Sequence, residues 1–175
     1  MLIMQLVQEG KLKLDHTISD HLLYYRKDTG DRITVHHLMA HQSGIPDFTS
    51  SFDYRDTVSR LSFGKDEFIK EHCSGDLAHE PGTIYSYSNA GYVILGRIIE
   101  KVTRKTFEQN LQKRILDPLK MKNSGYDRNE YVIEKRASGY TRGPFGYTRA
   151  DYMDMDSSPG ASGALYSTVV DMFHI

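Results

Sequence analysis

The feature that most constrains this chain is the stretch from residue 80 to residue 103, EPGTIYSYSNAGYVILGRIIEKVT. A Pro-Gly turn leads into a short aromatic run of β-like composition. Apolar residues then recur at helical spacing at Tyr92, Leu95, Ile99 and Val102. Because Ser88 and Asn89 are both good N-terminal caps, the stretch predicts a helix that begins at one of them and ends near Thr103.

Tyr87 and Asn89 stand at the start of this predicted helix. A residue just ahead of a helix is held between two fixed elements while its side chain faces solvent or a cleft. A phenol and an amide in that position are well placed for proton transfer and hydrogen bonding. We therefore take Tyr87 and Asn89 as the candidate site, although their position alone assigns them no reaction.

The size and charge of the chain exclude several classes of protein. Its 175 residues fit one domain or one lobe of a larger one, and 39% hydrophobic residues with a mean hydropathy of -0.51 predict a soluble, globular chain with a real core. The formal net charge is -1, and the Lys and Arg residues are scattered among Asp and Glu. A nucleic-acid binder would gather its basic residues in a patch, so we expect no nucleic-acid partner.

The single Cys73 excludes an internal disulfide framework and a multi-cysteine metal site, and it leaves the cellular compartment open. No apolar run approaches the roughly 20 residues of a transmembrane helix. Residues 1–10 lack the basic flank and cleavage site of a signal peptide. They are apolar and periodic from the first residue, so we expect the chain to open inside a helix that Gly10 ends.

Other helices are predicted from capping residues and apolar periods, at 35–41 (capped by Thr34), 65–73, 106–117 (started by Thr106) and from 169 onward (capped by Ser167 or Thr168). Residues 18–24 read as a short helical or extended segment. A long surface loop is expected over 45–64. Between residues 120 and 158 we expect loops and at most a small hairpin, near 137–140 and 147–152.

Two motifs suggest chemistries that their context disfavours. His36, His37 and His41 invite a metal site, because His37 and His41 would share a helix face, but no Glu follows His37 and a third ligand is not evident. Capping and packing roles are favoured, with the His41 imidazole bonding loop backbone. Asp28-Thr29-Gly30 matches the aspartic-protease signature once, in a polar segment, and is interpreted as a turn. We expect no metal and no cofactor.

Four blocks resemble, in the same order, the penicillin-recognising serine hydrolases: class C β-lactamases, D-alanyl-D-alanine peptidases and related esterases. The blocks are LVQEGKL (6–12), TVHHLMAHQSGIP (34–46), residues 80–103 together with DPLKM (117–121), and GALYSTVVDM (163–172). A small departure is Lys120, where relatives often have glycine. The blocks cover nearly the whole chain.

The resemblance implies a mechanism. A serine, activated by a lysine one helical turn later, attacks an amide or ester carbonyl and forms an acyl-enzyme, while a Tyr-x-Asn element supplies proton transfer and a substrate hydrogen bond. Tyr87 and Asn89 match that element. The implied substrate of the parent enzyme is a small molecule or a peptide, and relatives are often extracytoplasmic.

The resemblance also implies two elements outside the matched blocks. The Ser-x-x-Lys element is expected before Met1, and the Lys-Thr-Gly or His-x-Gly element after Ile175. The one Ser-x-x-Lys within the chain runs from Ser62 to Lys65. Gly64 is a poor helical spacer inside it, so we interpret Ser62 as an N-terminal cap of the 65–73 helix and not as a nucleophile.

The sequence thus predicts a mainly α structure over residues 1–175, the helical lobe of an α+β parent with short hairpins and most of its antiparallel sheet missing. Apolar faces on the first helix and on 169–173 would then be exposed and favour self-association. The expected function is that of a serine hydrolase fragment, inactive as given. The alternatives are a non-catalytic binding module that uses the pocket wall, or a part completed by another chain.

Overall fold

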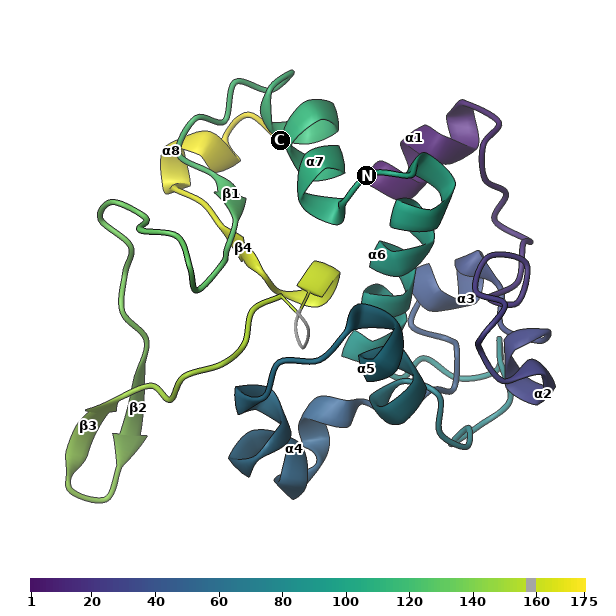
Figure 1. Cartoon of the computed structure of the whole chain (residues 1–175), viewed down its shortest axis with the longest axis horizontal. Coiled ribbons are helices and arrows are strands. Elements are labelled where there is room, and N and C mark those ends of the chain that lie inside the picture. Colours follow the sequence, from purple (N-terminus) through teal and green to yellow (C-terminus); the bar gives the residue numbers. More distant parts are fainter. Residues whose placement is uncertain (157–159) are drawn as a thin grey trace.

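The computed structural model describes residues 1–156 and 160–175, and it is mainly helical with short strands, as predicted (Figure 1). The α-helices are α1 (Leu2–Gln8), α2 (Lys27–Gly30), α3 (Val35–Met39), α4 (Phe52–Asp56), α5 (Lys65–His72), α6 (Asn89–Thr103), α7 (Phe107–Leu111) and α8 (Val169–Met172). Shorter turns are η1 (Phe48–Ser50), η2 (Val58–Arg60) and η4 (Gly160–Ser162), and α7 continues into a π-helical turn, η3 (Gln112–Leu116). The strands are β1 (Gly125–Tyr126), β2 (Tyr140–Gly143), β3 (Gly146–Arg149) and β4 (Leu165–Tyr166).

Helix α6 is the element on which most others pack. Helices α1, α3, α5 and α7, and the turns η1 and η4, all contact it. The sequence predicts a single apolar stripe, but the structure buries residues such as Ala90, Ile94 and Ile98 on other sides of the helix as well, because neighbours cover it nearly all round. Tyr92, which belongs to the predicted stripe, is still 36% exposed. Asn89 is therefore the first residue of a helix that is buried on several sides.

The predicted caps are largely confirmed. The Thr34 hydroxyl accepts a hydrogen bond from the His37 N–H, and Thr106 and Thr168 cap α7 and α8 in the same way. Gly10 follows the first helix with φ of +68°, the left-handed region that glycine tolerates. Lys120 has φ of +55°, which explains why a glycine suits that position.

Residues 45–64 are more ordered than the predicted surface loop. They form η1, α4 and η2, because the Asp47 side chain caps η1 and the Ser51 side chain caps α4. The Phe48 and Tyr54 rings are buried and meet edge to face, with centroids 4.9 Å apart. Residues 28–30 are also a correction: they lie in helix α2 and not in a polar turn.

The strands form two separate antiparallel pairs. Strand β1 pairs with β4, Gly125 opposite Tyr166, and β2 pairs with β3 in a hairpin that projects away from the helices (Figure 1). The hairpin predicted in this region is confirmed, but its strands are residues 140–143 and 146–149 and not 137–140 and 147–152. The register is set by the tight turn at Gly146, whose φ is +117°.

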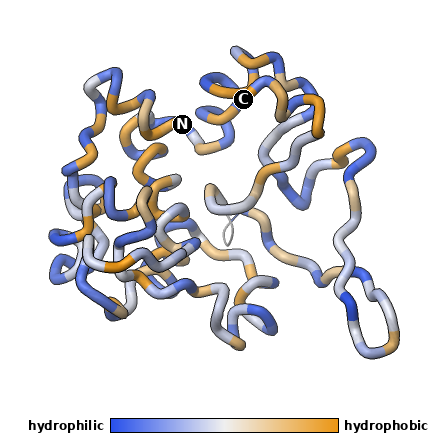
Figure 2. Tube along the Cα trace, turned by 180° about the vertical axis from the view of Figure 1, so that it is seen from behind, coloured by the Kyte–Doolittle hydropathy of each residue, from blue (hydrophilic) through white to orange (hydrophobic). Residues whose placement is uncertain are grey.

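Apolar side chains are exposed at both ends of the chain, as predicted. Met1 and Met4 are 63% and 46% exposed, and Val169 and Phe173 are 78% and 86% exposed. Apolar stretches flank both termini in Figure 2. A mainly apolar hollow of about 540 Å³ lies between α1, α6, α7, β4 and α8. Within residues 1–156 and 160–175, no helix has the length and hydropathy needed to span a bilayer.

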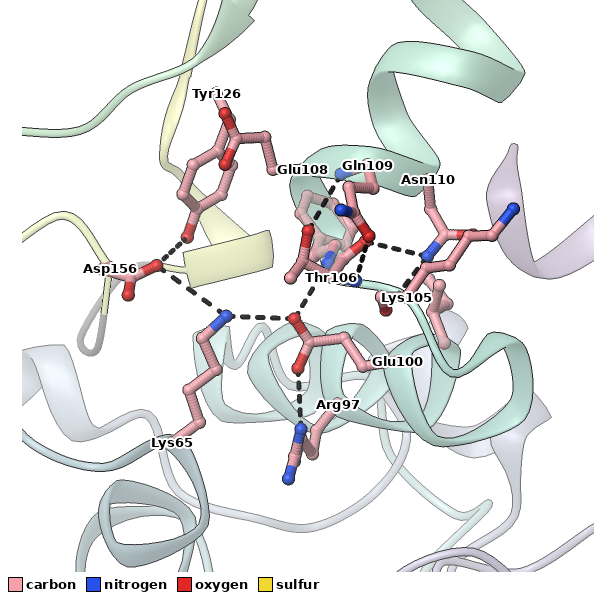
Figure 3. A network of polar contacts seen from close by, with 12 residues as sticks. Lys65, Arg97, Glu100, Lys105, Thr106, Glu108, Gln109, Asn110, Tyr126 and Asp156 are labelled. Carbon is pink, nitrogen blue, oxygen red and sulfur yellow. Dashed lines mark hydrogen bonds and ion pairs between the residues drawn. The ribbon is translucent and has the colours of Figure 1, made fainter. Parts of the chain in front are cut away.

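An ionic network centred on the buried Glu100 joins α5, α6 and α7 (Figure 3). The Glu100 carboxylate, whose side chain is 7% exposed, accepts from Lys65 Nζ at 3.0 Å, from Arg97 Nη1 at 2.9 Å and from the Phe107 N–H at 2.8 Å. Lys65 Nζ also lies 3.7 Å from the Asp156 carboxylate. The network ties the start of α7 to the middle of the core.

Candidate active site

The residues ahead of α6 are held by the turn that follows α3. The Ser86 N–H donates to the His41 carbonyl oxygen and the Gly82 N–H to that of Gln42, both at 2.8 Å. The predicted β-like run at 83–87 forms no strand. Its extended backbone lies against the 41–47 turn through these bonds, which carries Tyr87 to the mouth of the helix.

The His41 side chain contacts this segment. Its φ is +53°, a left-handed conformation that histidine adopts more readily than most residues. Its Nδ1 accepts from the Ser88 N–H at 3.3 Å, and its ring lies 4.5 Å from the Tyr87 ring and stacks on Tyr92 at 4.9 Å. The predicted bond from the imidazole to loop backbone is confirmed, but the partner is 47 residues away in the sequence.

The other two histidines of the cluster lie in α3. Helix α3 ends at Met39, so the four-residue spacing does not place His37 and His41 on one helix face. His37 Nδ1 instead accepts from the Thr34 N–H at 3.3 Å. Burial, and then the neighbouring His36, lower the pKa of His37, which favours the neutral ring that this bond needs.

The start of α6 is capped from outside the helix. Ser88 occupies the N-cap position, but its side chain makes no capping bond and its hydroxyl donates to the Pro46 carbonyl oxygen at 3.4 Å. Asp47 Oδ1 accepts from the Asn89 N–H at 3.2 Å. A carboxylate here also complements the positive end of the helix dipole.

Tyr87 and Asn89 are in direct contact. The Tyr87 hydroxyl donates to Asn89 Oδ1 at 3.1 Å, and the Tyr87 side chain is 55% exposed. Asn89 Nδ2 lies 3.2 Å from each Asp47 carboxylate oxygen and 3.4 Å from Thr49 Oγ1. The phenol, the amide and the carboxylate therefore form one hydrogen-bonded chain whose phenol end is open to solvent.

A pocket of about 320 Å³ opens beside Asn89. It is lined by Phe48, Thr49, Tyr54, Arg55, Asn89, Met153, Ser162 and Gly163. Its walls thus come from the η1–α4 segment, from the first turn of α6 and from residues near η4. A group bound there would lie next to the Asn89 amide.

Sequence reasoning missed Asp47. Its one local signal, an acidic residue between Pro46 and a short helix, indicates a cap for η1, and Asp47 does cap the Thr49 N–H. Its bonds to Asn89 span 42 residues, and a single sequence carries no sign of that pairing.

The interpretation of Ser62 as a cap of the helix at 65 is wrong. Gly64 is the N-cap of α5, and its N–H donates to Glu67 Oε2 at 3.2 Å. The Ser62 hydroxyl instead donates to Asp154 Oδ2, and Lys65 Nζ contacts Glu100. Both side chains of this Ser-x-x-Lys are thus bound to carboxylates, which does not suit a nucleophile and its base.

Known proteins are similar to this chain in sequence and in fold. A family model described as Beta-lactamase matches residues 1–175. The curated "Protein flp" of Staphylococcus aureus strain MW2 is 32% identical over 142 residues, which cover 79% of this chain and 28% of that protein. Teichoic acid D-alanine hydrolase of Staphylococcus aureus is 28% identical over 172 residues, 98% of this chain and 41% of that protein. The chain spans less than half the length of these relatives.

A solved structure shows the same fold. The D-amino acid amidase from Ochrobactrum anthropi SV3, in complex with L-phenylalanine, superposes with a TM-score of 0.82 at 30% identity. The match covers 99% of this chain and 49% of that protein. The helices around α6 and the short strands are therefore about half of that enzyme's fold.

Proposed function

The chain belongs to the Beta-lactamase family, and from that premise we propose that it is part of a serine hydrolase that cleaves amide or ester bonds through an acyl-enzyme. The observation that carries the proposal is the contact between Tyr87 and Asn89, which have the Tyr-x-Asn spacing and lie at the mouth of a buried helix. Residues 1–175 would supply the helical lobe, with most of the antiparallel sheet outside them.

In this proposal Tyr87 moves the proton. A serine oxygen attacks the substrate carbonyl, the carbonyl carbon–leaving group bond breaks, and the serine proton reaches the leaving amine or alcohol by way of the phenol. Water then releases the acyl group from the serine. The exposed Tyr87 hydroxyl is accessible to both partners of this transfer. Asn89 orients the substrate beside it.

The nucleophile would not come from Ser62. Its hydroxyl contacts Asp154 and the lysine of its motif contacts Glu100, so residues 1–175 alone are proposed to be inactive. The serine and its lysine would belong to a Ser-x-x-Lys element ahead of α1, as the family pattern implies.

The proposed substrates are amides or esters of D-amino acids. Two similar proteins carry names of that kind, a D-amino acid amidase and a teichoic acid D-alanine hydrolase. The pocket beside Asn89, with the aromatic rings of Phe48 and Tyr54 and the Arg55 guanidinium in its lining, would hold the part of the substrate next to the scissile bond.

The test begins with the DNA around the coding sequence. An in-frame Ser-x-x-Lys about two helical turns ahead of residue 1, and Lys-Thr-Gly or His-x-Gly after residue 175, define the longer protein to express. Hydrolysis of D-alanine amide and of a D-alanyl ester is then measured for the wild type, for Tyr87→Phe and for the control Tyr85→Phe.

Tyr87→Phe should lower kcat/KM by about 10²–10⁴-fold, the usual contribution of a positioned acid or base, while Tyr85→Phe should leave it nearly unchanged. Full activity in Tyr87→Phe would overturn the role of Tyr87. Stop codons close to both ends of the coding sequence would overturn the proposal for the native product.

A second candidate function rests on the apolar hollow and the exposed apolar ends. The residues of α1 and α8 that face solvent would hold a second chain, either a copy of this one or a chain that completes the fold. Sedimentation velocity of the 175-residue chain checks this: a concentration-dependent dimer supports the candidate, and a monomer throughout the concentration range contradicts self-association.

A further inference from the structure

The Asp47 carboxylate contacts both the backbone N–H and the side-chain amide nitrogen of Asn89. Its Oδ1 accepts from the Asn89 backbone N–H, and both its oxygens lie 3.2 Å from Asn89 Nδ2. The Thr49 hydroxyl donates to Asp47 Oδ2 at 2.7 Å and lies 3.4 Å from the same Nδ2. The carboxylate is thus held in place by its own turn while it faces the first residue of α6.

This contact determines the orientation of the Asn89 side-chain amide. An ionised carboxylate can only accept hydrogen bonds, so the end of Asn89 that faces it must be the NH₂ group. With the amide nitrogen directed at Asp47 and Thr49, the carbonyl oxygen must point the other way. That is where the Tyr87 hydroxyl donates to it at 3.1 Å.

We propose that Asp47 is a positioning residue that orients the Asn89 amide so that its carbonyl oxygen faces Tyr87 and accepts from the phenol. A free amide presents donors or an acceptor with equal ease, because it can rotate by half a turn. Here Nδ2 faces Asp47 and Thr49, and Oδ1 accepts from the Tyr87 hydroxyl.

The orientation of Asn89 stands on these contacts alone, and only its bearing on hydrolysis rests on the proposed function. The same orientation directs the Tyr87 proton toward Asn89. A change at Asp47 would therefore alter both partners of the candidate site without touching Tyr87.

The test is proton NMR on the 175-residue chain labelled with ¹⁵N, which requires no catalysis. The variants are Asp47→Asn, which can donate as well as accept and so permits Asn89 to rotate, and Asp53→Asn as a control. Asp53 is an exposed residue of nearby α4 with the same charge. Two quantities are measured: the hydrogen-exchange rate of the Asn89 NH₂ protons, and the cross-relaxation of these protons with the Tyr87 ring.

In the wild type and in Asp53→Asn, the Asn89 NH₂ protons should exchange about fivefold more slowly than those of an exposed asparagine, as one net hydrogen bond predicts. In Asp47→Asn this protection should fall, and cross-relaxation with the Tyr87 ring should increase. Unprotected NH₂ protons in the wild type would overturn the inference. So would an Asp47→Asn variant that is folded by its backbone amide spectrum and keeps wild-type protection and cross-relaxation. Neither result would bear on hydrolysis, which the Tyr87→Phe assay decides separately.

Discussion

Helix α6 carries two polar clusters that differ in burial and in charge. At its N-terminus, Tyr87 and Asn89 bond to each other and to Asp47, and the phenol is open to solvent. Three turns further on, Glu100 is buried between two cations and a backbone N–H (Figure 3). The first cluster leaves a phenol accessible, whereas the second surrounds a buried carboxylate with partly buried cations. We therefore expect the first to act on ligands and the second on stability.

The electrostatics of Glu100 follow from its partners. Burial alone would raise the pKa of this carboxyl, but the Phe107 N–H, Lys65 and Arg97 together outweigh burial and leave the pKa below its ordinary value. The charge is therefore retained inside the protein at neutral pH. Removing the Glu100 carboxylate leaves Lys65 with Asp156 at 3.7 Å and Arg97 with Asp66, and it removes the one buried charge on which both cations converge.

The largest expected effect is that of Glu100→Ala. It leaves Lys65 and Arg97 without their buried carboxylate and the Phe107 N–H without an acceptor, so the free energy of unfolding should fall by about 3 kcal/mol. Urea unfolding measures this. Glu71→Ala, at an exposed residue of α5, is the control and should change stability by less than about 0.5 kcal/mol. Equal losses in both variants would erase the distinction between the clusters.

The second prediction concerns acid. Because the pKa of Glu100 is lowered from 4.5 in the folded protein, the unfolded chain binds more protons around that pH, and stability falls as the pH drops. Between about pH 5 and pH 3, the free energy of unfolding should fall less steeply for Glu100→Gln than for the wild type. Parallel curves from chemical unfolding at each pH would contradict this.

A smaller loss is expected for Asp47→Ala. The Asn89 N–H loses its acceptor at the start of α6, which typically costs about 1 kcal/mol. Thermal unfolding of this variant is compared with Asp53→Ala, whose side chain is exposed in α4. A loss as large as that of Glu100→Ala would mean that the site cluster is itself a main support of the fold.

The smallest effect is expected for Tyr87→Phe. The hydroxyl is exposed, so its removal should change the free energy of unfolding by less than about 0.5 kcal/mol. Tyr126→Phe is the matched comparison, because the Tyr126 side chain is buried and its hydroxyl donates to Asp156 Oδ1. Loss of that hydrogen bond should lower the free energy of unfolding by about 1 kcal/mol. Thermal unfolding of both variants checks the order, and a larger loss in Tyr87→Phe would reverse the comparison.

Local signals in the sequence predicted much of the fold. Thr34 and Thr106 start their helices as capping chemistry requires, and Gly10 adopts the left-handed conformation that ends the first one. These features depend on residues three or four positions apart, which a sequence displays directly. The site residues Tyr87 and Asn89 were predicted as candidates for the same reason, and their catalytic role remains a proposal.

Contacts between distant segments were not predictable. The bonds from Asp47 to Asn89 and from His41 to Ser88 join residues more than 40 positions apart. The burial of α6 on several sides likewise depends on which helices pack around it, and its sequence alone showed only one apolar stripe. Ser62 was taken for a helix cap because its carboxylate partner lies 92 residues away.

The most direct test of the account is intact-mass spectrometry of the 175-residue chain after incubation with a fluorophosphonate and, separately, with a β-lactam. We propose that Tyr87 and Asn89 are the proton-transfer part of a site whose nucleophile is not Ser62, and we therefore expect no covalent adduct with either reagent. Stoichiometric labelling that disappears in Ser62→Ala would contradict it.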